Sequence, residues 1–333
     1  MRNVVPKSCI RVDPARMHEF VLEAGRAAGL PEEKAALLAK LLTENDLKGN
    51  FSHGTRAVGR YCRSMMNGQI NSNPQVTTVG ETEFSLLVDG DGGLGYFPCY
   101  EGTLALIEKL KKVPMGVVVT RNHGHIGAAG TYATMTLEHD LLCFITSGVQ
   151  LRLSPGLPVY RAAGGSPVAF SAPAGEEPDL LLDFGTMHDL YERDPHRDEI
   201  ARLAPGMVFR HIGLGAVCQT WGGLLAGLPV DQTRAERKFD GATQGALILA
   251  LKISLFMQPD EFKKQMDEYV RAVRELKPVD GFDKAYLPGG PEAEYMKEFT
   301  REGIPVGPEH QAGLESIAEE LGIELPWGGH ACA

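Results

Sequence analysis

Apolar residues fall at helical spacing through the first part of the chain. These residues are Leu22, Ala27, Leu30, Ala36, Leu37, Leu41 and Leu42. The spacing predicts two helices between Pro14 and Asn50, separated at Gly29-Leu30-Pro31, because glycine and proline interrupt helical periodicity. A third helix is predicted over 56–67, and Gly68 is suited to close it. The amino-terminal part of the chain is therefore predicted to be helical.

Farther along, short apolar runs alternate with helical patterns. Strands are predicted over 84–89, 117–120, 141–147, 180–184 and 247–255, and helices over 98–112, 128–138, 214–228, 259–276 and 314–321. This alternation is typical of an α/β protein.

Two segments place histidines next to glycines. Ser52-His53-Gly54 follows the predicted amino-terminal helices, and Asn122-His123-Gly124-His125 follows the apolar run Val117–Val119. An imidazole titrates near neutral pH, so either segment can supply a proton donor or acceptor. The glycines near His125 fit a helix start that faces an anion, and a tight structural turn explains them equally well.

His53 is the first candidate for proton transfer. A positioned imidazole can donate a proton to a reacting group or accept one from it. The alternative is a histidine at a helix end that only hydrogen-bonds the backbone. Asp183 is the second candidate, since it ends an apolar strand, where an ionised carboxylate needs a partner. A histidine is the expected partner of Asp183, and a plain turn residue is the alternative.

Composition limits the classes of function. The 333 residues carry a formal net charge of −10, which argues against nucleic-acid binding and against an anionic membrane surface. No apolar run approaches the ~18–20 residues of a membrane span, and residues 1–14 lack a signal-peptide core. The six cysteines are scattered without a C-x-x-C pair, which favours reduced thiols in a cytoplasm over a zinc site. We therefore expect a cytoplasmic protein without a metal site.

Six motifs distributed along the chain resemble those of one enzyme family. They are Ser52–Tyr61, Gly124–Ala133, Gly164–Phe170, Leu181–Met187, Leu287–Glu292 and Arg301–Pro305. In these segments the chain is similar to the type-2 malate/L-lactate dehydrogenases, a group of non-Rossmann NAD(P)-dependent oxidoreductases. The resemblance extends over nearly the whole chain.

The resemblance implies an architecture and an activity. A cofactor-binding α/β domain with a mixed, non-Rossmann sheet would span 76–254, and residues 1–75 and 255–333 would form a helical substrate and dimerisation domain. The protein would be a homodimer that uses NAD or NADP. Its substrate would be a small 2-oxo or 2-imino acid, interconverted with the 2-hydroxy or 2-amino acid.

The resemblance also implies roles for residues. His53 would be the general acid/base, Asp183 its electrostatic support and His125 a second polar group of the pocket. Ser52, Arg56 and Arg60 would bind the substrate. The residues expected at the cofactor are Asp179, Leu181, Leu182, Asp183, Phe184, Gly185, His211, Ile212, Gly289 and Gly290.

Several positions depart from the family pattern. Ala57 stands where the family usually has arginine, so Arg56 or Arg60 would have to contact the substrate carboxylate. Ile212 replaces a lysine commonly placed at the cofactor. The interval between Asp183 and His211 is shorter than is usual in the family. Two basic residues, Arg210 together with Arg193 or Arg197, could contact a cofactor phosphate there.

Two other functions stay open at this stage. These departures are also compatible with a family scaffold that has lost nicotinamide chemistry and acts as a ligand-binding protein. A metal-dependent lyase built on His53, His123 and His125 is the second alternative.

Overall fold

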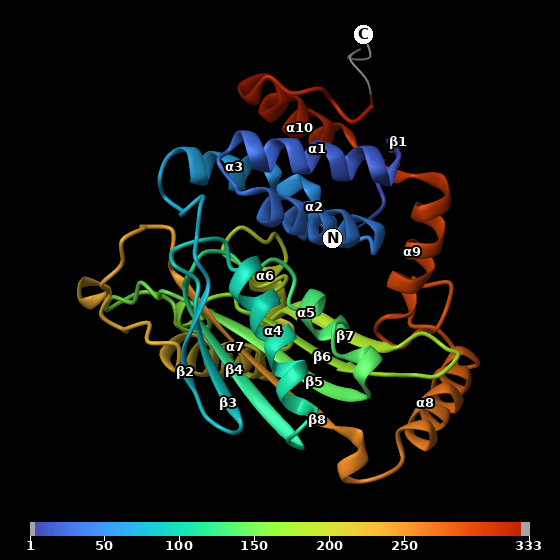
Figure 1. Ribbon diagram of the computed structural model, residues 1–333. Coiled ribbons are helices and arrows are strands. Elements are labelled where there is room, and N and C mark those ends of the chain that lie inside the picture. The colour runs from blue at the N-terminus through green and yellow to red at the C-terminus, as the bar shows by residue number, and fades with distance from the viewer. Residues whose placement is uncertain (1–3, 328–333) are drawn as a thin grey trace. The chain divides into compact units, whose positions relative to one another are not determined.

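The computed structural model describes residues 4–327 of the chain, which form two compact units (Figure 1). The helical unit comprises residues 4–74 and 289–327, and the sheet unit comprises residues 75–288. Within residues 4–327, every helix falls short of the length and apolar character that crossing a bilayer requires. The cysteines described by the structure carry free thiols, and Cys332 lies outside the described residues.

The helical unit combines segments from both ends of the chain. Its elements are β1 (Ile10–Val12), α1 (Pro14–Ala27), α2 (Glu32–Leu47), α3 (Val58–Met66), α9 (Gly290–Glu302), β9 (Ile304–Val306) and α10 (Pro308–Leu321). Strand β1 pairs with β9 in antiparallel orientation, which joins the two segments. Helix α1 begins at Pro14, where the Asp13 carboxylate accepts hydrogen bonds from the backbone N–H groups of Ala15 and Arg16.

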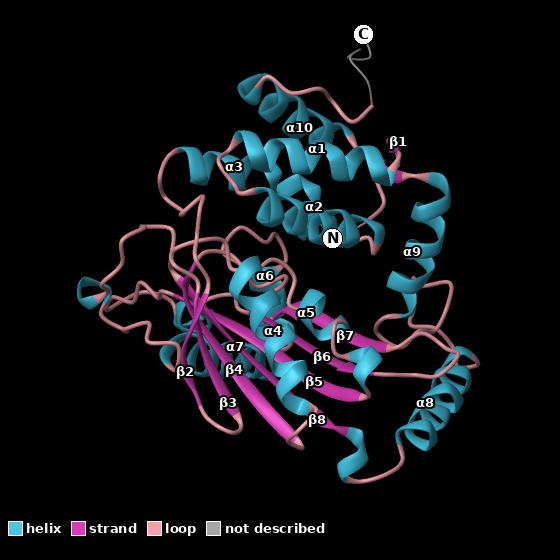
Figure 2. Cartoon of the chain, viewed as in Figure 1, coloured by secondary structure: helices cyan, strands magenta, loops and turns pink. Residues whose placement is uncertain are grey.

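The sheet unit is built on a seven-stranded sheet (Figure 2). Its strands are β2 (Thr77–Glu81), β3 (Ser85–Asp89), β4 (Met115–His123), β5 (Leu141–Val149), β6 (Pro167–Ala172), β7 (Leu180–Gly185) and β8 (Gln244–Lys252). Their order is β2-β3-β4-β8-β5-β6-β7, in which only β3 and β4 are parallel. The predicted α/β class with a mixed sheet is confirmed.

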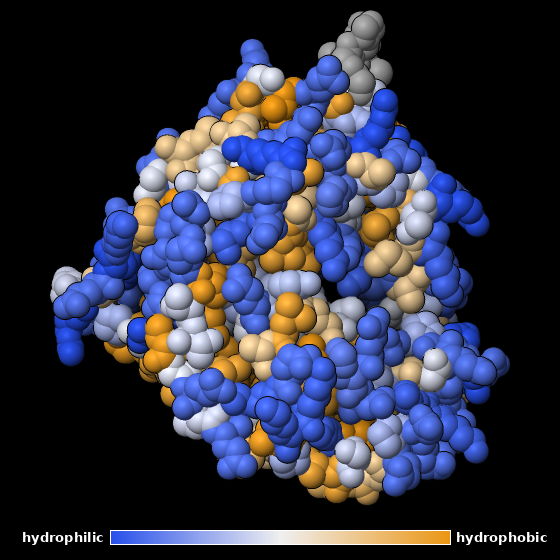
Figure 3. Space-filling view, in the orientation of Figure 1, coloured by the Kyte–Doolittle hydropathy of each residue, from blue (hydrophilic) through white to orange (hydrophobic). Residues whose placement is uncertain are grey.

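Alternating side chains of the central strands divide the sheet into two faces. On β5, Leu141, Cys143 and Ile145 point to a buried core that includes residues of α4 (Tyr96–Leu110) and α5 (Gly130–Thr134). These two helices cover this face of the sheet (Figure 1). On the face of the protein drawn in Figure 3, hydrophilic side chains dominate and apolar atoms form scattered groups.

The opposite face of the sheet packs against α7 (Pro205–Cys218) and the π-helical segment that follows it, Gln219–Leu224. A Cβ atom on Gly148 would lie 2.3 Å from the backbone nitrogen of Gly223. Only glycine permits so close an approach of the two backbones. Phe144 contacts Trp221 edge to face on the same side, with ring centroids 5.7 Å apart.

Several elements differ from their predicted limits. Helix α7 begins at Pro205, nine residues before the predicted start at 214, because proline favours the first turn of a helix. Strand β8 covers 244–252 instead of 247–255, in register with β5 from Leu141 to Val149. The predicted helix over 128–138 is confined to α5, and a 3₁₀ turn follows it at 137–139. Helix α9 and strand β6 were not predicted, since neither carries a clear apolar period.

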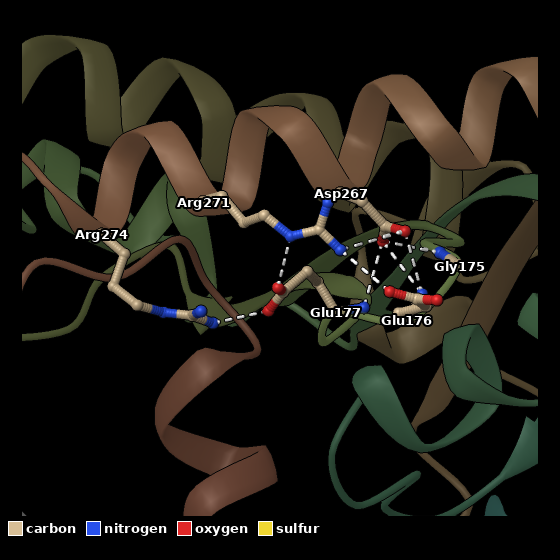
Figure 4. A network of polar contacts seen from close by, with 6 residues as sticks. All are labelled: Gly175, Glu176, Glu177, Asp267, Arg271 and Arg274. Carbon is tan, nitrogen blue, oxygen red and sulfur yellow. Dashed lines mark hydrogen bonds and ion pairs between the residues drawn. The ribbon is translucent and has the colours of Figure 1, made fainter.

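The predicted domain limit at residue 255 is wrong for the carboxy-terminal side. Helix α8 (Pro259–Arg274) belongs to the sheet unit, which extends along the chain to Pro288. Lys263 of α8 forms an ion pair with Asp140 at 2.9 Å. Asp267 of α8 accepts hydrogen bonds from three consecutive backbone N–H groups, at residues 175–177 (Figure 4). A helical pattern by itself does not indicate which unit a helix packs against.

Asp267 is expected to be a main stabilising contact of α8. Burial raises the pKa of its carboxyl, but the three N–H donors outweigh that effect and the pKa lies below its usual range. Asp267→Ala should lower the free energy of unfolding by about 2–3 kcal/mol, because hydrogen bonds to a charged acceptor are lost and buried donors lose their partner. Urea unfolding at pH 7 measures this loss. Glu268→Ala, an exposed change on the same helix, is the control, and equal midpoints for both variants would contradict the prediction.

Candidate active site

His53 lies on a short turn that follows helix α2. Two consecutive 3₁₀ turns, Phe51–His53 and Thr55–Ala57, lead from α2 into α3. The Nδ1 atom of His53 is 2.9 Å from the Ser52 hydroxyl and 3.3 Å from Oδ1 of Asn50. Contacts within the turn therefore engage Nδ1 and orient the ring.

The imidazole of His53 is held neutral at physiological pH. Its pKa is lowered to about 4, first because burial disfavours the charged ring and second because the Arg60 guanidinium repels it. The residue is nevertheless partly exposed. A neutral, partly exposed imidazole can accept a proton from a hydroxyl group, which is the step that alcohol oxidation requires.

Two arginines follow His53 and differ in their surroundings. The Arg56 guanidinium pairs with Glu309 of α10 at 2.8 Å. Arg60 lies over the ring of Tyr61, with 5.0 Å between the guanidinium carbon and the ring centroid, and donates a hydrogen bond of 3.3 Å to the Tyr61 hydroxyl. Arg60 is exposed, and its charge acts on His53. The charge of Arg60 thus acts on His53, whereas Arg56 is paired with a carboxylate.

A buried polar cluster that the sequence analysis missed lies under the His53 turn. Asp46 is fully buried and accepts hydrogen bonds from the backbone N–H and the hydroxyl of Thr55. That hydroxyl is 2.9 Å from Nε2 of His310, in α10. The spacing of Leu38, Leu42 and Asp46 is a signal that could have revealed the cluster, because it places a carboxylate on the apolar face of α2.

The second histidine segment contains one structural and one accessible ring. His123 is fully buried, with Nδ1 2.8 Å from the Gly124 carbonyl and Nε2 2.8 Å from the Thr120 hydroxyl. Burial lowers its pKa to about 4. His125 is partly exposed, and its Nδ1 accepts a hydrogen bond of 3.3 Å from the Gly127 N–H. In the neutral ring this leaves the proton of His125 on Nε2.

Asp183 lies in β7 and interacts with the start of α5. Its Oδ2 atom accepts a hydrogen bond of 2.8 Å from the backbone N–H of Gly130. A Cβ atom on Gly130 would lie 2.8 Å from the same oxygen, so glycine is required for this approach. Asp183 and His125 belong to the sheet unit, and His53 belongs to the helical unit.

The residues expected at a cofactor fall into accessible and buried groups. Every residue of β7, from Leu180 to Gly185, is partly exposed. The Nδ1 of His211 donates to the Thr186 carbonyl at 3.0 Å, whereas Ile212 is 7% exposed and packs in a small apolar cluster with Met187. A lysine amine would be unfavourable in these surroundings, which accounts for isoleucine at this position.

The remaining cofactor candidates lie at the ends of elements. Asp179 precedes β7 and accepts a hydrogen bond of 2.7 Å from the Ala174 N–H, and burial raises the pKa of its carboxyl. Gly289 has a φ of 100° and caps the start of α9, whose first residue is Gly290.

The predicted basic group for a cofactor phosphate is only partly supported. Arg193 and Arg210 are exposed, whereas Arg197 stacks over the Tyr160 ring at 4.4 Å. Within residues 4–327 no three histidine, cysteine, aspartate or glutamate side chains are grouped to hold a metal ion. His123 has both ring nitrogens engaged, which is unfavourable for the metal-dependent lyase alternative.

Comparison with known proteins identifies the family. The model of the malate/L-lactate dehydrogenase family matches residues 12–188 and 193–315. The chain belongs to this family. Its members are dehydrogenases, and the chain is therefore an oxidoreductase of the malate/lactate dehydrogenase type.

Relatives and solved structures cover almost the whole chain. Malate dehydrogenase of Pyrococcus horikoshii is 24% identical over 356 aligned residues, which span 97% of this chain and 99% of the relative. L-sulfolactate dehydrogenase of Methanocaldococcus jannaschii is 26% identical over 340, spanning 94% and 97%. Ureidoglycolate dehydrogenase (NAD(+)) of Escherichia coli O157:H7 is 22% identical over 325, spanning 89% and 93%. The solved structure of the Pyrococcus horikoshii enzyme superposes with a TM-score of 0.83 over 96% of this chain and 98% of that chain, at 24% identity, so the fold is the same.

Proposed function

We propose that the protein is an NAD(P)-dependent oxidoreductase that interconverts a small 2-hydroxy acid and its 2-oxo acid, or the 2-amino and 2-imino counterparts. The observation that carries the proposal is His53, a neutral and partly exposed imidazole oriented by Ser52 and acted on by the charge of Arg60. In the family to which the chain belongs, relatives act on malate and sulfolactate, as their names state. Both substrates combine a hydroxyl group with an acidic group.

His53 would act as general acid/base through Nε2, because Nδ1 is engaged within its turn. During oxidation Nε2 accepts the hydroxyl proton as the C–O bond becomes a carbonyl. During reduction the protonated ring returns that proton to the oxygen. A nicotinamide cofactor, when bound, would supply or receive the hydride and thereby balance the two electrons.

The family resemblance predicts that His125 and Asp183 support this chemistry. The Nε2–H of neutral His125 is a donor suited to a substrate oxygen. Asp183 holds the Gly130 backbone N–H, which fixes the start of α5 five residues after His125. Support of His53 by Asp183 stays a prediction from the family resemblance.

The residues of the sheet unit fit a dinucleotide. Strand β7 is an edge strand of the sheet, and each of its residues from Leu180 to Gly185 is partly exposed, so its backbone is accessible. His211 is fixed through Nδ1 and keeps Nε2 as an acceptor, which suits a ribose hydroxyl. We infer that these groups line the cofactor. The same role for Gly289 and Gly290 stays a prediction from the family resemblance, and a cofactor role for Ile212 lacks such support.

Arg60 is the arginine that we assign to the substrate carboxylate. Arg60→Ala should raise the KM for the 2-oxo acid by about 10–100-fold, because hydrogen bonds to a charged group contribute ~1.5–3 kcal/mol. Arg56→Ala is the matched control and should change this KM less than about threefold, since Glu309 already pairs with Arg56. Steady-state kinetics at saturating NADH measure both values. A larger effect at Arg56 than at Arg60 would reverse the assignment.

Cofactor binding tests the proposed function against the repurposed scaffold. Purified protein is titrated with NADH and NADPH while fluorescence and thermal stability are followed, and a panel of 2-oxo acids and cyclic imines is then assayed with both. Saturable binding and turnover support the proposal. No response to either nucleotide at millimolar concentration would favour a ligand-binding scaffold, for which Ala57 and Ile212 are the motivating departures.

We also propose a homodimer, and we place its interface on the α7 side of the sheet unit instead of on the helical domain that the family resemblance implies. Large apolar side chains are exposed there, at Leu203, Met207, Phe209, Val217, Trp221, Leu224 and Leu225. Phe170 of β6 is 42% exposed and contacts Phe144 in a tilted arrangement, with ring centroids 4.9 Å apart. A monomer rarely leaves so many large apolar groups in water. Light scattering should give twice the chain mass, and a monomeric mass would contradict this part of the proposal. A cytoplasmic location stays a prediction.

A further inference from the structure

We infer that Asp46, Thr55 and His310 form a buried hydrogen-bonded chain that positions His53 for proton transfer. The inference rests on the proposed role of His53, and it assigns a task to three residues that contact neither substrate nor cofactor in the proposal. Asp46 comes from the end of α2, Thr55 from the turn after His53 and His310 from α10. All three are buried.

The end of α2 holds the His53 turn at successive residues. The Asn45 amide donates a hydrogen bond of 3.2 Å to the carbonyl of His53. The next side chain, Asp46, accepts from the backbone N–H of Thr55 at 3.1 Å. Between these contacts, Gly54 lies so close to Asp46 that a Cβ atom there would be 1.8 Å from Oδ1. The backbone on the carboxyl side of His53 is thus fixed against α2 on both sides of Gly54.

The Thr55 hydroxyl connects this contact to α10. It lies 2.5 Å from Oδ2 of Asp46 and 2.9 Å from Nε2 of His310. Burial, and then the Arg56 charge, lower the pKa of His310 to about 3, so its ring is neutral. With Asp46 ionised, His310 Nε2–H donates to Thr55 Oγ1, and the Thr55 hydroxyl donates to Asp46. Removal of the hydroxyl would interrupt the chain at its centre and leave a buried donor without a partner.

Burial of the Asp46 carboxyl costs free energy, and an apolar side chain could fill the same space without that cost. Asp46 is fully buried, and its Oδ1 has no hydrogen-bond partner among the described residues. Burial raises the pKa of this carboxyl to about 7, whereas the Thr55 contacts and the Arg56 charge lower it. A buried, incompletely satisfied carboxylate is retained where it orients a neighbouring group better than an apolar residue can. Here the neighbouring group is the backbone that carries His53.

Positioning of this kind has a kinetic signature. Displacement of a catalytic group by ~1 Å can cost about 10²-fold in rate. His53 is not among the residues assigned to the cofactor, so cofactor affinity should not change. Thr55→Val keeps the side-chain shape and removes the hydroxyl, so kcat should fall about 10–100-fold while the Kd for NADH stays within about twofold. Thr55→Ser restores the hydroxyl and should recover most of kcat.

Thr43→Val provides the matched control. Thr43 is also buried in α2, and its hydroxyl makes no hydrogen bond to any described residue, so the same chemical change should leave kcat unchanged. Urea unfolding of each variant corrects kcat for the folded fraction. Long-range ¹H–¹⁵N spectra of the histidine rings provide a readout independent of turnover, in which Thr55→Val should move the His53 and His310 signals and Thr43→Val should not.

The outcomes separate this inference from the proposed function. If His53→Ala abolishes turnover but Thr55→Val retains wild-type kcat and His53 ring signals, the positioning chain is refuted and the function stands. If His53→Ala retains turnover, the catalytic role proposed for His53 is wrong. The His53 ring signals of Thr55→Val then decide alone whether the hydrogen-bonded chain positions the His53 side chain. An equal loss of kcat in Thr55→Ser and Thr55→Val would also overturn the inference.

Discussion

Replacement of His53 by alanine is expected to lower kcat for oxidation of a 2-hydroxy acid by about 10²–10⁴-fold, the usual contribution of a positioned general acid/base. The hydroxyl proton then has to pass to water. The Kd for NADH should stay within about twofold, because the residues assigned to the cofactor lie in the sheet unit and at Gly289 and Gly290. Stopped-flow turnover and fluorescence titration of the same preparation measure the two effects.

Two further substitutions sharpen this test. His53→Gln keeps polarity and approximate size but cannot transfer a proton near neutral pH, so it should be as slow as His53→Ala. His139→Ala removes an exposed histidine of the sheet unit and should retain wild-type kcat. Loss of NADH binding with normal residual turnover in His53→Ala would contradict the assigned role.

The fold could be predicted from the sequence where periodicity is strong. Helices α1 and α2 and strand β5 lie within their predicted ranges or extend them by a few residues, because each buries one continuous apolar face. Strand β1 and strand β9 have three residues each and gain their structure from pairing with each other, nearly 300 positions apart. No local sequence pattern indicates which distant segment such a short strand pairs with. The membership of α8 in the sheet unit depends likewise on the long-range contacts of Asp267 and Lys263.

The candidate site was predictable in its motifs but not in its surroundings. The Ser52-His53-Gly54 motif located the imidazole, and folding supplied its neutral state through burial and Arg60. The sequence left both Arg56 and Arg60 as candidates. The ion pair of Arg56 with Glu309 and the effect of the Arg60 charge on His53 distinguish them. His310 could not be predicted at all, since it reaches Thr55 across 255 positions of the chain.

Acidification should destabilise the folded protein steeply between about pH 6.5 and 4.5. Burial lowers the pKa of His53 and His123 to about 4 and that of His310 to about 3, whereas an unfolded histidine titrates near ~6.5. In this window the unfolded chain binds three protons that the folded rings exclude. Asp46 opposes the effect, because burial raises its pKa to about 7 and the folded state retains one proton that the unfolded chain releases.

An unfolded histidine is only half protonated at pH ~6.5, so the net difference grows toward two protons as the pH falls. The free energy of unfolding should therefore fall by about 2 kcal/mol for each pH unit on average, at ~1.4 kcal/mol per proton. The helical unit contributes one of these protons, through His53, His310 and Asp46, and the sheet unit contributes the other through His123. Urea unfolding followed by circular dichroism at pH 6.5, 5.5 and 4.5 measures the slope. His123→Gln should reduce it by about half, whereas the exposed substitution His139→Gln should leave it unchanged. Stability that is constant or rises on acidification would show that these rings are charged in the folded state, and an imidazole charged at position 53 would be unable to accept the hydroxyl proton.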